Sequence, residues 1–266
     1  MAADDFKGFV VVVTGASTGL GRAIAVETAG RGAATVVVNY ASNVADAEET
    51  GKRVEALGAK AVLVQGDVAK DEDCRAIAEA ARPFGRIDAL FNNAGTTTFA
   101  AHGNMDAVSA DDFLRLYAVN VVGAFQMVRA CRALLEAAPQ PGAVVNTASI
   151  AGVTGIGSSV PYAASKGALN TMTLSLARAL APKIRVNAVC PGFIDTPWFG
   201  KGLGAEGAER VRANAAANTP LKAASTPEDI AAATVFLASP AARHVTGETL
   251  LVDAGSHLGF APLVAR

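Results

Sequence analysis

Short apolar runs alternate along most of the chain with longer segments whose apolar residues recur every three or four positions. The runs are rich in valine, which is typical of strands buried on both faces, and the longer segments have the period of a helix. The predicted strands cover residues 9–14, 34–39, 59–66, 87–92, 143–149, 184–190 and 248–253. The predicted helices cover residues 20–32, 43–58, 71–83, 109–137, 162–181 and 226–239.

This alternation predicts the fold class. Strands that follow one another through helices pair in parallel, and right-handed crossovers place helices on both faces of the sheet. We therefore expect an α/β protein with a Rossmann-like, doubly wound, mainly parallel seven-stranded sheet. No segment rich in Pro, Gly or Ser divides the chain, so residues 1–266 are expected to form a single domain. Ligands of such sheets bind at the carboxyl ends of the strands, where candidate chemistry is to be sought.

Composition narrows the classes of partner. Of the 266 residues 51% are hydrophobic and 18% are charged, which excludes a disordered chain. The net charge of −1 gives no reason to expect nucleic acid or an anionic membrane as a partner. No apolar run approaches the length of about 20 residues that a spanning helix needs, and the acidic N-terminus is unlike a secretory signal. A cytoplasmic protein is expected. The three cysteines and three histidines are scattered, so no disulfide framework or metal site is expected.

The turn after the first predicted strand is rich in glycine. Gly15 allows a tight turn, Gly19 allows close approach of a pyrophosphate, and Gly21 allows the following helix to pack against the strand. The helix that begins near Leu20 presents free N–H groups and the positive end of its dipole to the phosphates. The alternative interpretation is an ordinary turn between a strand and a helix. Because this glycine-rich turn joins the first strand to the first helix of an alternating chain, a dinucleotide site is the favoured interpretation.

The residues after the second and third strands bear on the choice of dinucleotide. A carboxylate after the second strand would bind the ribose 2′-hydroxyl of NAD, but this chain has Asn39 and Tyr40 there. Ser42, Asn43 and backbone N–H groups could donate to a 2′-phosphate, which favours NADP(H). No Lys or Arg stands in this stretch, so NAD(H) remains possible. Asp67 could accept a hydrogen bond from the adenine amino group, or it could cap the next helix.

A candidate reaction centre follows the later strands. Tyr162 and Lys166 are spaced to lie on one face of a helix, and Ser149 ends the fifth predicted strand. An ordinary phenol has a pKa near 10, which is too high for acid–base work near neutrality. An ammonium about 4 Å away would lower the pKa of the phenol by up to about 3 units. The alternative is a packed tyrosine beside a lysine whose charged end reaches solvent.

Together these motifs resemble the short-chain dehydrogenase/reductase family over about residues 8–255. The resemblance rests on several motifs in the family's order: Thr14-Gly-x-x-x-Gly-x-Gly21, Asp67, Asn92-Asn-Ala-Gly95, Asn120, Ser149, Tyr162-x-x-x-Lys166, Asn187 and Pro191-Gly192. A basic residue that many NADP-dependent members carry is absent at Ser17, Thr18 and Tyr40.

The resemblance implies an NAD(P)-dependent oxidoreductase that interconverts a ketone and a secondary alcohol. In that reaction Tyr162 would be the general acid/base and Ser149 would hydrogen-bond the reacting oxygen. Lys166 would lower the pKa of Tyr162 and bind the nicotinamide ribose, and Asn120 would hold a water in a proton relay. The implied cofactor-binding residues are Gly15, Ser17, Thr18, Gly19, Leu20, Gly21, Asn39, Tyr40, Ser42, Asp67, Val68, Asn93, Ala94, Gly95, Tyr162, Lys166, Pro191, Gly192, Ile194 and Thr196.

The substrate is bounded only coarsely by the sequence. The expected substrate walls, residues 96–106, 151–160 and 198–218, are mostly apolar, and residues 196–218 are expected to form a lid. They carry Phe99, His102, Met105, Val153, Ile156, Trp198, Phe199 and Leu203. This lining suits a small or medium carbonyl compound or alcohol. An acyl thioester on an acidic carrier protein is the alternative substrate, and the lack of Lys or Arg in residues 134–142 argues against it.

Two further expectations concern function class and assembly. A catalytically silent dinucleotide-binding sensor is the alternative to an enzyme, but such a protein would be free to lose one of the four catalytic positions. The low charge and the alanine-rich faces of residues 109–137 and 162–181 suggest contacts with other subunits. The family resemblance implies a homotetramer, with residues 258–264 as a candidate for a second interface.

Overall fold

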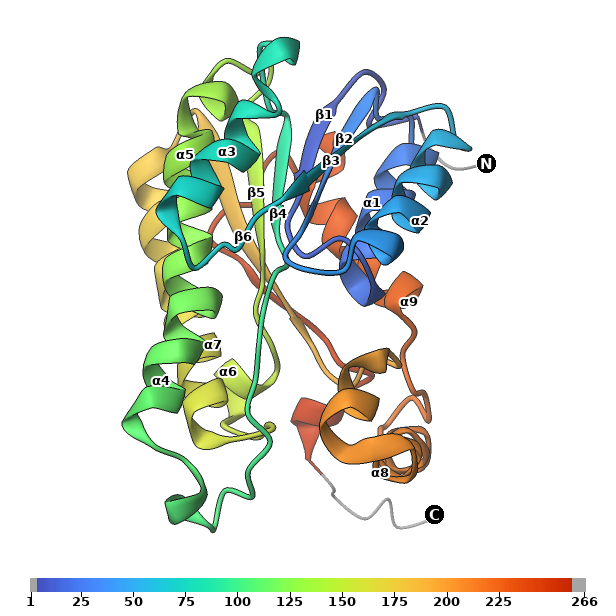
Figure 1. Ribbon diagram of the computed structural model, residues 1–266, viewed down its shortest axis with the longest axis vertical. Coiled ribbons are helices and arrows are strands. Elements are labelled where there is room, and N and C mark those ends of the chain that lie inside the picture. Colours follow the sequence, from blue (N-terminus) through green and yellow to red (C-terminus); the bar gives the residue numbers. More distant parts are fainter. Residues whose placement is uncertain (1–3, 260–266) are drawn as a thin grey trace.

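In the computed structural model, which describes residues 4–259, a seven-stranded sheet lies between two layers of helices (Figure 1). The strand order is β3-β2-β1-β4-β5-β6-β7, and every neighbouring pair is parallel. The expected doubly wound parallel sheet is therefore confirmed. The strands are β1 (Val10–Val13), β2 (Thr35–Tyr40), β3 (Lys60–Gln65), β4 (Ala89–Asn92), β5 (Gly142–Thr147), β6 (Ile184–Pro191) and β7 (Thr249–Val252).

Helices cover both faces of the sheet. In Figure 1 helices α3, α5 and α7 lie on one side, and α1, α2 and α9 lie on the other. Beyond the carboxyl ends of the strands, α4 and α6 stand opposite α8. The helices are α1 (Gly19–Gly30), α2 (Val44–Glu55), α3 (Asp71–Glu79), α4 (Ala110–Tyr117), α5 (Ala124–Glu136), α6 (Ala151–Thr154), α7 (Val160–Leu180), α8 (Pro197–Asn218) and α9 (Pro227–Ala238).

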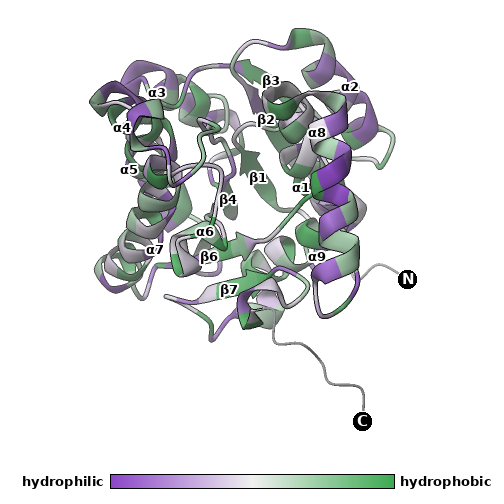
Figure 2. Cartoon of the chain, turned by 90° about the horizontal axis from the view of Figure 1, so that it is seen from below, coloured by the Kyte–Doolittle hydropathy of each residue, from purple (hydrophilic) through white to green (hydrophobic). Residues whose placement is uncertain are grey.

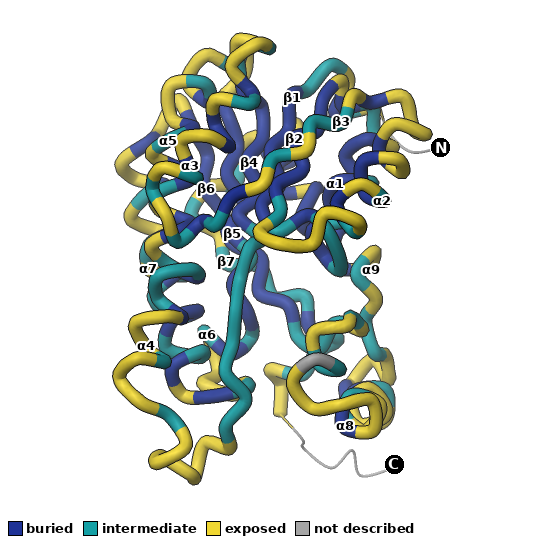
Figure 3. Tube along the Cα trace, viewed as in Figure 1, coloured by how far each residue is buried: buried dark blue, intermediate teal, exposed yellow. Residues whose placement is uncertain are grey.

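Strand β1 shows why these sequences form central strands. Val11 and Val13 point into the core beneath α1 and α9, and Val10 and Val12 point into the core beneath α3 and α5. Because successive side chains of a strand alternate between faces, an all-valine strand buries apolar surface on both. Figure 3 shows the central strands as buried, and Figure 2 shows hydrophobic residues gathered on them.

The predicted helix 109–137 is interrupted. It consists of α4, a π-helical turn over Ala118–Gly123, and α5. The stretch Ala110–Glu136 is long and apolar enough, by length and composition, to cross a membrane, and 44% of its most apolar window is buried within the protein. Polar residues such as Asn120 and Gln126 interrupt this stretch, so it contains no continuous apolar run of that length. Burial of residues such as Met127 and Leu135 against the sheet accounts for the hydropathy of this helix within a globular fold.

Two helices were not predicted. Helix α6 is a single turn directly after β5, and α8 coincides with the expected lid at residues 196–218. Helix α8 contains four glycines, which are poor helix formers, and it is kinked at Gly204, where φ is +72°. That composition explains why periodicity did not reveal it. Of the tail proposed for a second interface, residues 260–264 lie outside the described residues.

Candidate active site

Two adjoining cavities form one cleft along the carboxyl ends of the strands. The first has a volume of about 230 Å³ and the second, toward β2 and β3, has a volume of about 320 Å³. Predicted cofactor residues that line the first are Gly15, Thr18, Gly19, Leu20, Asn93, Ala94, Gly95, Tyr162, Lys166, Pro191, Gly192, Ile194 and Thr196. Those that line the second are Gly15, Ser17, Thr18, Asn39, Ser42, Asp67, Val68, Ala94 and Gly95.

Two predicted cofactor residues do not line this cleft. Tyr40 ends β2 but lies outside both linings, so its predicted contact finds no support in the geometry. Gly21 is buried, and a Cβ atom added there would lie 2.3 Å from the carbonyl oxygen of Gly15. Gly21 therefore acts through close packing of α1 against the turn, as its spacing suggested, and not through contact with a ligand.

The glycine-rich turn is held by the loop that follows β4. The hydroxyl of Thr14 accepts hydrogen bonds from the backbone N–H groups of Asn93 and Ala94, each at 3.0 Å. In return, Asn93 Nδ2 donates to the carbonyl oxygens of Thr14 at 3.1 Å and Gly15 at 3.2 Å. Gly15 has φ of +60°, and a Cβ atom there would lie 2.9 Å from Ala94 Cα. These contacts fix the turn from which α1 begins, with its free N–H groups at the cleft.

Asn39 is engaged within the protein. Its Oδ1 accepts from Gly15 N at 3.2 Å, and its Nδ2 donates to the carbonyl oxygens of Gly66 at 3.0 Å and Val64 at 3.3 Å. With the residue only 1% exposed, this amide orients the glycine-rich turn and offers no free donor to a ligand. Asp67, the candidate adenine contact, lines the cleft and also accepts from Ala69 N at 3.0 Å.

The structure brings Ser149, Tyr162 and Lys166 together in the first cavity. Ser149 follows β5, and its hydroxyl accepts from Ala151 N at 3.1 Å at the start of α6. Tyr162 and Lys166 lie one turn apart near the start of α7. The ammonium of Lys166 donates to Thr147 O at 2.7 Å and lies 5.8 Å from the centre of the Tyr162 ring.

The electrostatics of this cluster correct one expectation. Burial raises the pKa of Tyr162, although a hydrogen bond with Ser149 acts in the opposite direction. Burial also lowers the pKa of Lys166 to about 8. Burial therefore outweighs the expected lowering of the Tyr162 pKa by Lys166. The physical reason is that desolvation disfavours both the phenolate and the ammonium, which the spacing of the motif could not reveal.

Asn120 lies in the π-helical turn and outside the lining of the cavities. Its Oδ1 accepts from Thr96 N at 2.8 Å, and its Nδ2 donates to Thr96 O and to Ser165 Oγ, each at 3.0 Å. Gly95 lies between Asn120 and the catalytic cluster, since a Cβ atom there would be 3.4 Å from Asn120 Oδ1 and 3.6 Å from Lys166 Nζ. Asn120 thus ties the loop after β4 to α7. The water relay that was expected of it stays a prediction.

A third cavity, of about 540 Å³, adjoins the reaction centre and is mostly apolar. It shares Ser149, Tyr162, Gly192, Trp198 and Phe199 with the first cavity, so the phenol stands where the two meet. The described lining contains no Asp, Glu, Lys or Arg. The predicted wall residues in it are Phe99, His102, Ile156, Trp198, Phe199 and Leu203, whereas Met105 and Val153 are not among its lining.

Aromatic residues from two segments of the chain line this third cavity and pack against one another. The rings of Phe193 and Phe199 stack with centres 5.0 Å apart, and Phe99 approaches Phe199 at 6.2 Å. Phe193 lies outside the predicted walls and was missed, although its place directly after Pro191-Gly192 was a usable signal for it. Val211 lies within the predicted wall at residues 198–218, and the structure places it in the lining. Among residues 4–259 no group of three or more His, Cys, Asp or Glu side chains could hold a metal ion.

Comparison with known proteins agrees with this architecture. A family model described as enoyl-(acyl carrier protein) reductase matches residues 15–257. The chain is 39% identical, over 97% of its length and 100% of the relative, to a Streptomyces violaceoruber protein named as ketoacyl reductase 2 of the granaticin polyketide synthase. It is 37% identical, over 96% of its length and 98% of the relative, to the L-rhamnose 1-dehydrogenase (NAD(P)⁺) of a Sphingomonas strain.

A solved structure from Burkholderia xenovorans, described as a short-chain dehydrogenase/reductase, matches with a TM-score of 0.86. Its sequence is 39% identical, and the match covers 95% of this chain and 99% of that one. Sequence, fold and full-length coverage agree. The chain belongs to the short-chain dehydrogenase/reductase family of oxidoreductases.

Proposed function

We propose that the protein interconverts a ketone and a secondary alcohol, with NADP(H) as the favoured cofactor and NAD(H) as a second one. The observation that carries this proposal is the position of Ser149 and Tyr162, which line both the cofactor-sized cleft and the apolar cavity. A carbonyl carbon placed between them would meet a dinucleotide on one side and the phenol on the other. A bound nicotinamide dinucleotide would supply or accept the hydride.

The residues around the cleft fit such a cofactor. Gly19 has φ of +55°, and a Cβ atom there would come within 3.3 Å of Thr196 Cγ2 and fill space beside the first turn of α1. The free N–H groups of that turn suit a pyrophosphate. The polar lining toward β2 and β3 suits an adenosine, and Ile194 and Thr196 lie where the nicotinamide end would be held.

The proton chemistry is assigned to Tyr162. In the reductive direction its phenol donates a proton to the carbonyl oxygen, and the Ser149 hydroxyl donates a hydrogen bond to the same oxygen. In the oxidative direction the phenolate accepts the proton of the alcohol. The ammonium of Lys166 stabilises the phenolate by its charge, and it is itself held by the Thr147 carbonyl. Asn120 supports this arrangement by holding the loop that carries Gly95 beside Lys166.

The substrate class follows from the third cavity. A pocket without ionised side chains among its described lining and with several aromatic rings favours an uncharged ketone with an apolar or ring-bearing body. A substrate with a polar group on every carbon would leave hydroxyls unpaired in such a pocket. The relative named as a ketoacyl reductase keeps a 3-oxoacyl thioester as the second candidate.

Cofactor choice rests on the end of β2. Asn39 offers no carboxylate that would repel a 2′-phosphate, and Ser42 and Asn43 line the cleft as neutral residues. The relative named as L-rhamnose 1-dehydrogenase carries both cofactors in its name, which supports use of either one.

A substrate panel tests the proposal. The purified protein is mixed with NADPH or NADH and with cyclic ketones, aromatic ketones, a 3-oxoacyl thioester, an aldose and a charged 2-oxo acid, and loss of the reduced-nicotinamide absorbance is followed. We expect turnover that is fastest with an uncharged ring-bearing ketone and NADPH. If both dinucleotides bind but none of the carbonyl or alcohol compounds is turned over, the chain is instead a silent dinucleotide-binding protein.

A further inference from the structure

The part of the cleft that would face the 2′ position of the adenosine ribose carries little charge. Its described lining contains one carboxylate, on Asp67, and no Lys or Arg. A 2′-phosphate brings up to two negative charges, which proteins usually meet with Arg or Lys. Besides Asn39, whose amide is engaged within the protein, the polar side chains in this lining are those of Ser17, Thr18, Ser42, Asn43, Asp67 and Thr96.

A guanidinium nevertheless lies directly behind this wall. Arg22, in the first turns of α1, donates to the carbonyl oxygen of Ser17 from Nη2 at 2.6 Å and from Nε at 3.1 Å. Its Nε also donates to Thr50 Oγ1 at 2.9 Å, which joins α1 to α2. The side chain of Arg22 is only 19% exposed. Only Ser17, which lines the cleft, therefore separates the charge of Arg22 from it, and water screens that charge only partly.

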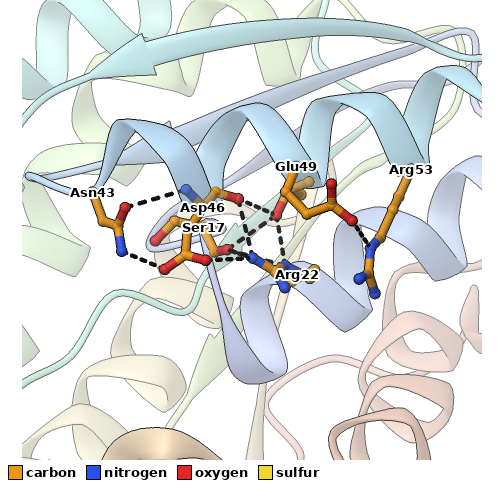
Figure 4. Close-up of polar contacts among 7 residues, drawn as sticks. Ser17, Arg22, Asn43, Asp46, Glu49 and Arg53 are labelled. Carbon is orange, nitrogen blue, oxygen red and sulfur yellow. Dashed lines mark hydrogen bonds and ion pairs between the residues drawn. The ribbon is translucent and has the colours of Figure 1, made fainter.

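Asp46 balances that charge and also engages a lining residue. Its Oδ1 accepts from Arg22 Nη2 at 3.2 Å, and its Oδ2 accepts from Nδ2 of Asn43. Asn43 in turn caps α2 by accepting from Asp46 N at 3.2 Å. Figure 4 shows the Asp46 carboxylate between the amide of Asn43 and the guanidinium of Arg22. One carboxylate thus neutralises the nearest cation and takes up an amide donor that a phosphate could use.

We propose that Asp46 is a specificity-determining residue, which lowers the affinity of the cleft for a 2′-phosphate and so limits its preference for NADP(H) over NAD(H). Arg22 is its counterpart and favours the phosphate. The inference rests on the proposed function, because it concerns the dinucleotide that this function requires. Both residues act through the wall of the cleft, by charge and by the orientation of Asn43.

Binding of adenosine fragments tests this inference without turnover. The dissociation constants of 2′,5′-ADP and 5′-AMP are measured by titration calorimetry for the wild type and for Asp46→Asn, which keeps the shape of the side chain. We expect Asp46→Asn to bind 2′,5′-ADP about fivefold more tightly and 5′-AMP unchanged, since only the former carries the 2′-phosphate. The gain should shrink at high salt. Equal affinities of the wild type and Asp46→Asn for 2′,5′-ADP would overturn the inference.

Arg22→Gln should change the affinity for 2′,5′-ADP in the opposite direction. This variant is expected to weaken 2′,5′-ADP about fivefold and to leave 5′-AMP unchanged. The double variant, with both charges removed, is expected to return toward the wild-type ratio. The ratio of KM values for NADP⁺ and NAD⁺ should follow the same order. A common loss of affinity for both fragments would indicate a merely structural role and would also overturn the inference.

Glu49→Gln is the matched control. Glu49 lies one turn further along α2, pairs with Arg53 at 2.8 Å and lies outside the lining of the cleft. Glu49→Gln removes one negative charge from the same helix as Asp46→Asn. We expect it to leave the ratio of the affinities for 2′,5′-ADP and 5′-AMP unchanged. If Glu49→Gln raises the ratio as much as Asp46→Asn, the effect belongs to the overall charge of α2 and the assignment to Asp46 is wrong.

These outcomes separate the inference from the proposed function. A wild-type chain that binds neither NADP⁺ nor NAD⁺ would overturn both. Tight binding of dinucleotides together with unchanged ratios in Asp46→Asn and Arg22→Gln would overturn the inference alone. Altered ratios without turnover of any carbonyl compound would support the inference and contradict the proposed catalysis.

Discussion

Lys166 places an ammonium in a site that water barely reaches, with 4% of the residue exposed. One carbonyl oxygen, that of Thr147, accepts its hydrogen bond at 2.7 Å. A single neutral acceptor does not replace the hydration of a full charge, so the pKa of Lys166 falls to about 8. The same burial raises the pKa of Tyr162. Burial therefore disfavours the charged forms of both side chains, and a protonated Lys166 lowers the stability of the fold.

The pKa of Lys166 predicts a pH dependence of stability. Between about pH 8 and 10 the unfolded chain keeps this proton while the folded protein has lost it, so the free energy of unfolding rises with pH. The rise is at most about 1.4 kcal/mol per pH unit. The Lys166→Met variant has no ammonium at this position, so its free energy of unfolding should lack this rise. Urea unfolding of both proteins without cofactor should show that the wild-type minus variant difference grows over this range. A flat difference would mean that the ammonium is not desolvated.

For single residues, membership of the site was easier to predict from the sequence than the pKa values or hydrogen-bond partners of its side chains. The spacing of Tyr162 and Lys166 and the position of Ser149 sufficed to place all three in one cavity. The direction of the Tyr162 pKa and the internal role of Asn39 depended on burial and on partners distant in sequence, such as Gly66. Neither the burial of a side chain nor a partner distant in the sequence can be recognised from the neighbouring residues alone.

At the scale of elements, all seven strands were predicted. The central ones form continuous apolar runs because they are buried on both faces, whereas the edge strand β3 is partly exposed and includes Lys60 and Gln65. The start of α9 near Thr226 was predicted as well, and the structure adds a capping box there, in which Thr226 N donates to Asp229 Oδ2 at 2.8 Å. Helix α8 and the π-helical turn at Ala118–Gly123 were not predicted. Four glycines, which are poor helix formers, obscure the helical pattern of α8. The π-helical turn spans only six residues, which is too short for a separate period to be recognised.

Close contact between α8 and the loop after β4 predicts a specific substitution effect. A Cβ atom on Gly202 would lie 2.0 Å from the ring of Phe99, whereas one on Gly200 would meet nothing within 4 Å. Gly202→Ala should displace the Phe99 ring and raise the KM for the carbonyl substrate several-fold, with the KM for NADPH unchanged. Gly200→Ala, its control on the same helix, should leave both unchanged. Equal substrate KM values in the two variants would show that Phe99 does not shape the substrate cavity.

At the scale of the whole molecule, large apolar side chains are exposed on α4, on the π-helical turn that follows it, and on α5 and α7. Leu114 is 69% exposed, and Val122, Phe125 and Leu174 are each more than 40% exposed. A cluster of exposed large apolar residues marks a contact surface on a protein with so little charge. These helices coincide with the alanine-rich segments singled out in the sequence, and we propose that they form subunit contacts of a homotetramer.

Light scattering coupled to size-exclusion chromatography tests this assembly. The wild type should elute as a tetramer at micromolar concentration, and Leu114→Glu should shift it toward smaller species because a carboxylate would be buried without a partner. Leu57→Glu is the control, since Leu57 is 48% exposed but lies just beyond α2, away from the proposed contact surface. A monomeric wild type would contradict the assembly and leave the apolar faces unexplained.

The central claim is that Tyr162 transfers the proton while the cleft holds the dinucleotide independently of it. The most direct test compares Tyr162→Phe with the wild type for turnover of the best ketone of the panel and for NADPH affinity by fluorescence titration. We expect kcat to fall by about 10²- to 10⁴-fold, with an NADPH dissociation constant within about twofold of the wild type. Undiminished turnover in Tyr162→Phe would contradict the account.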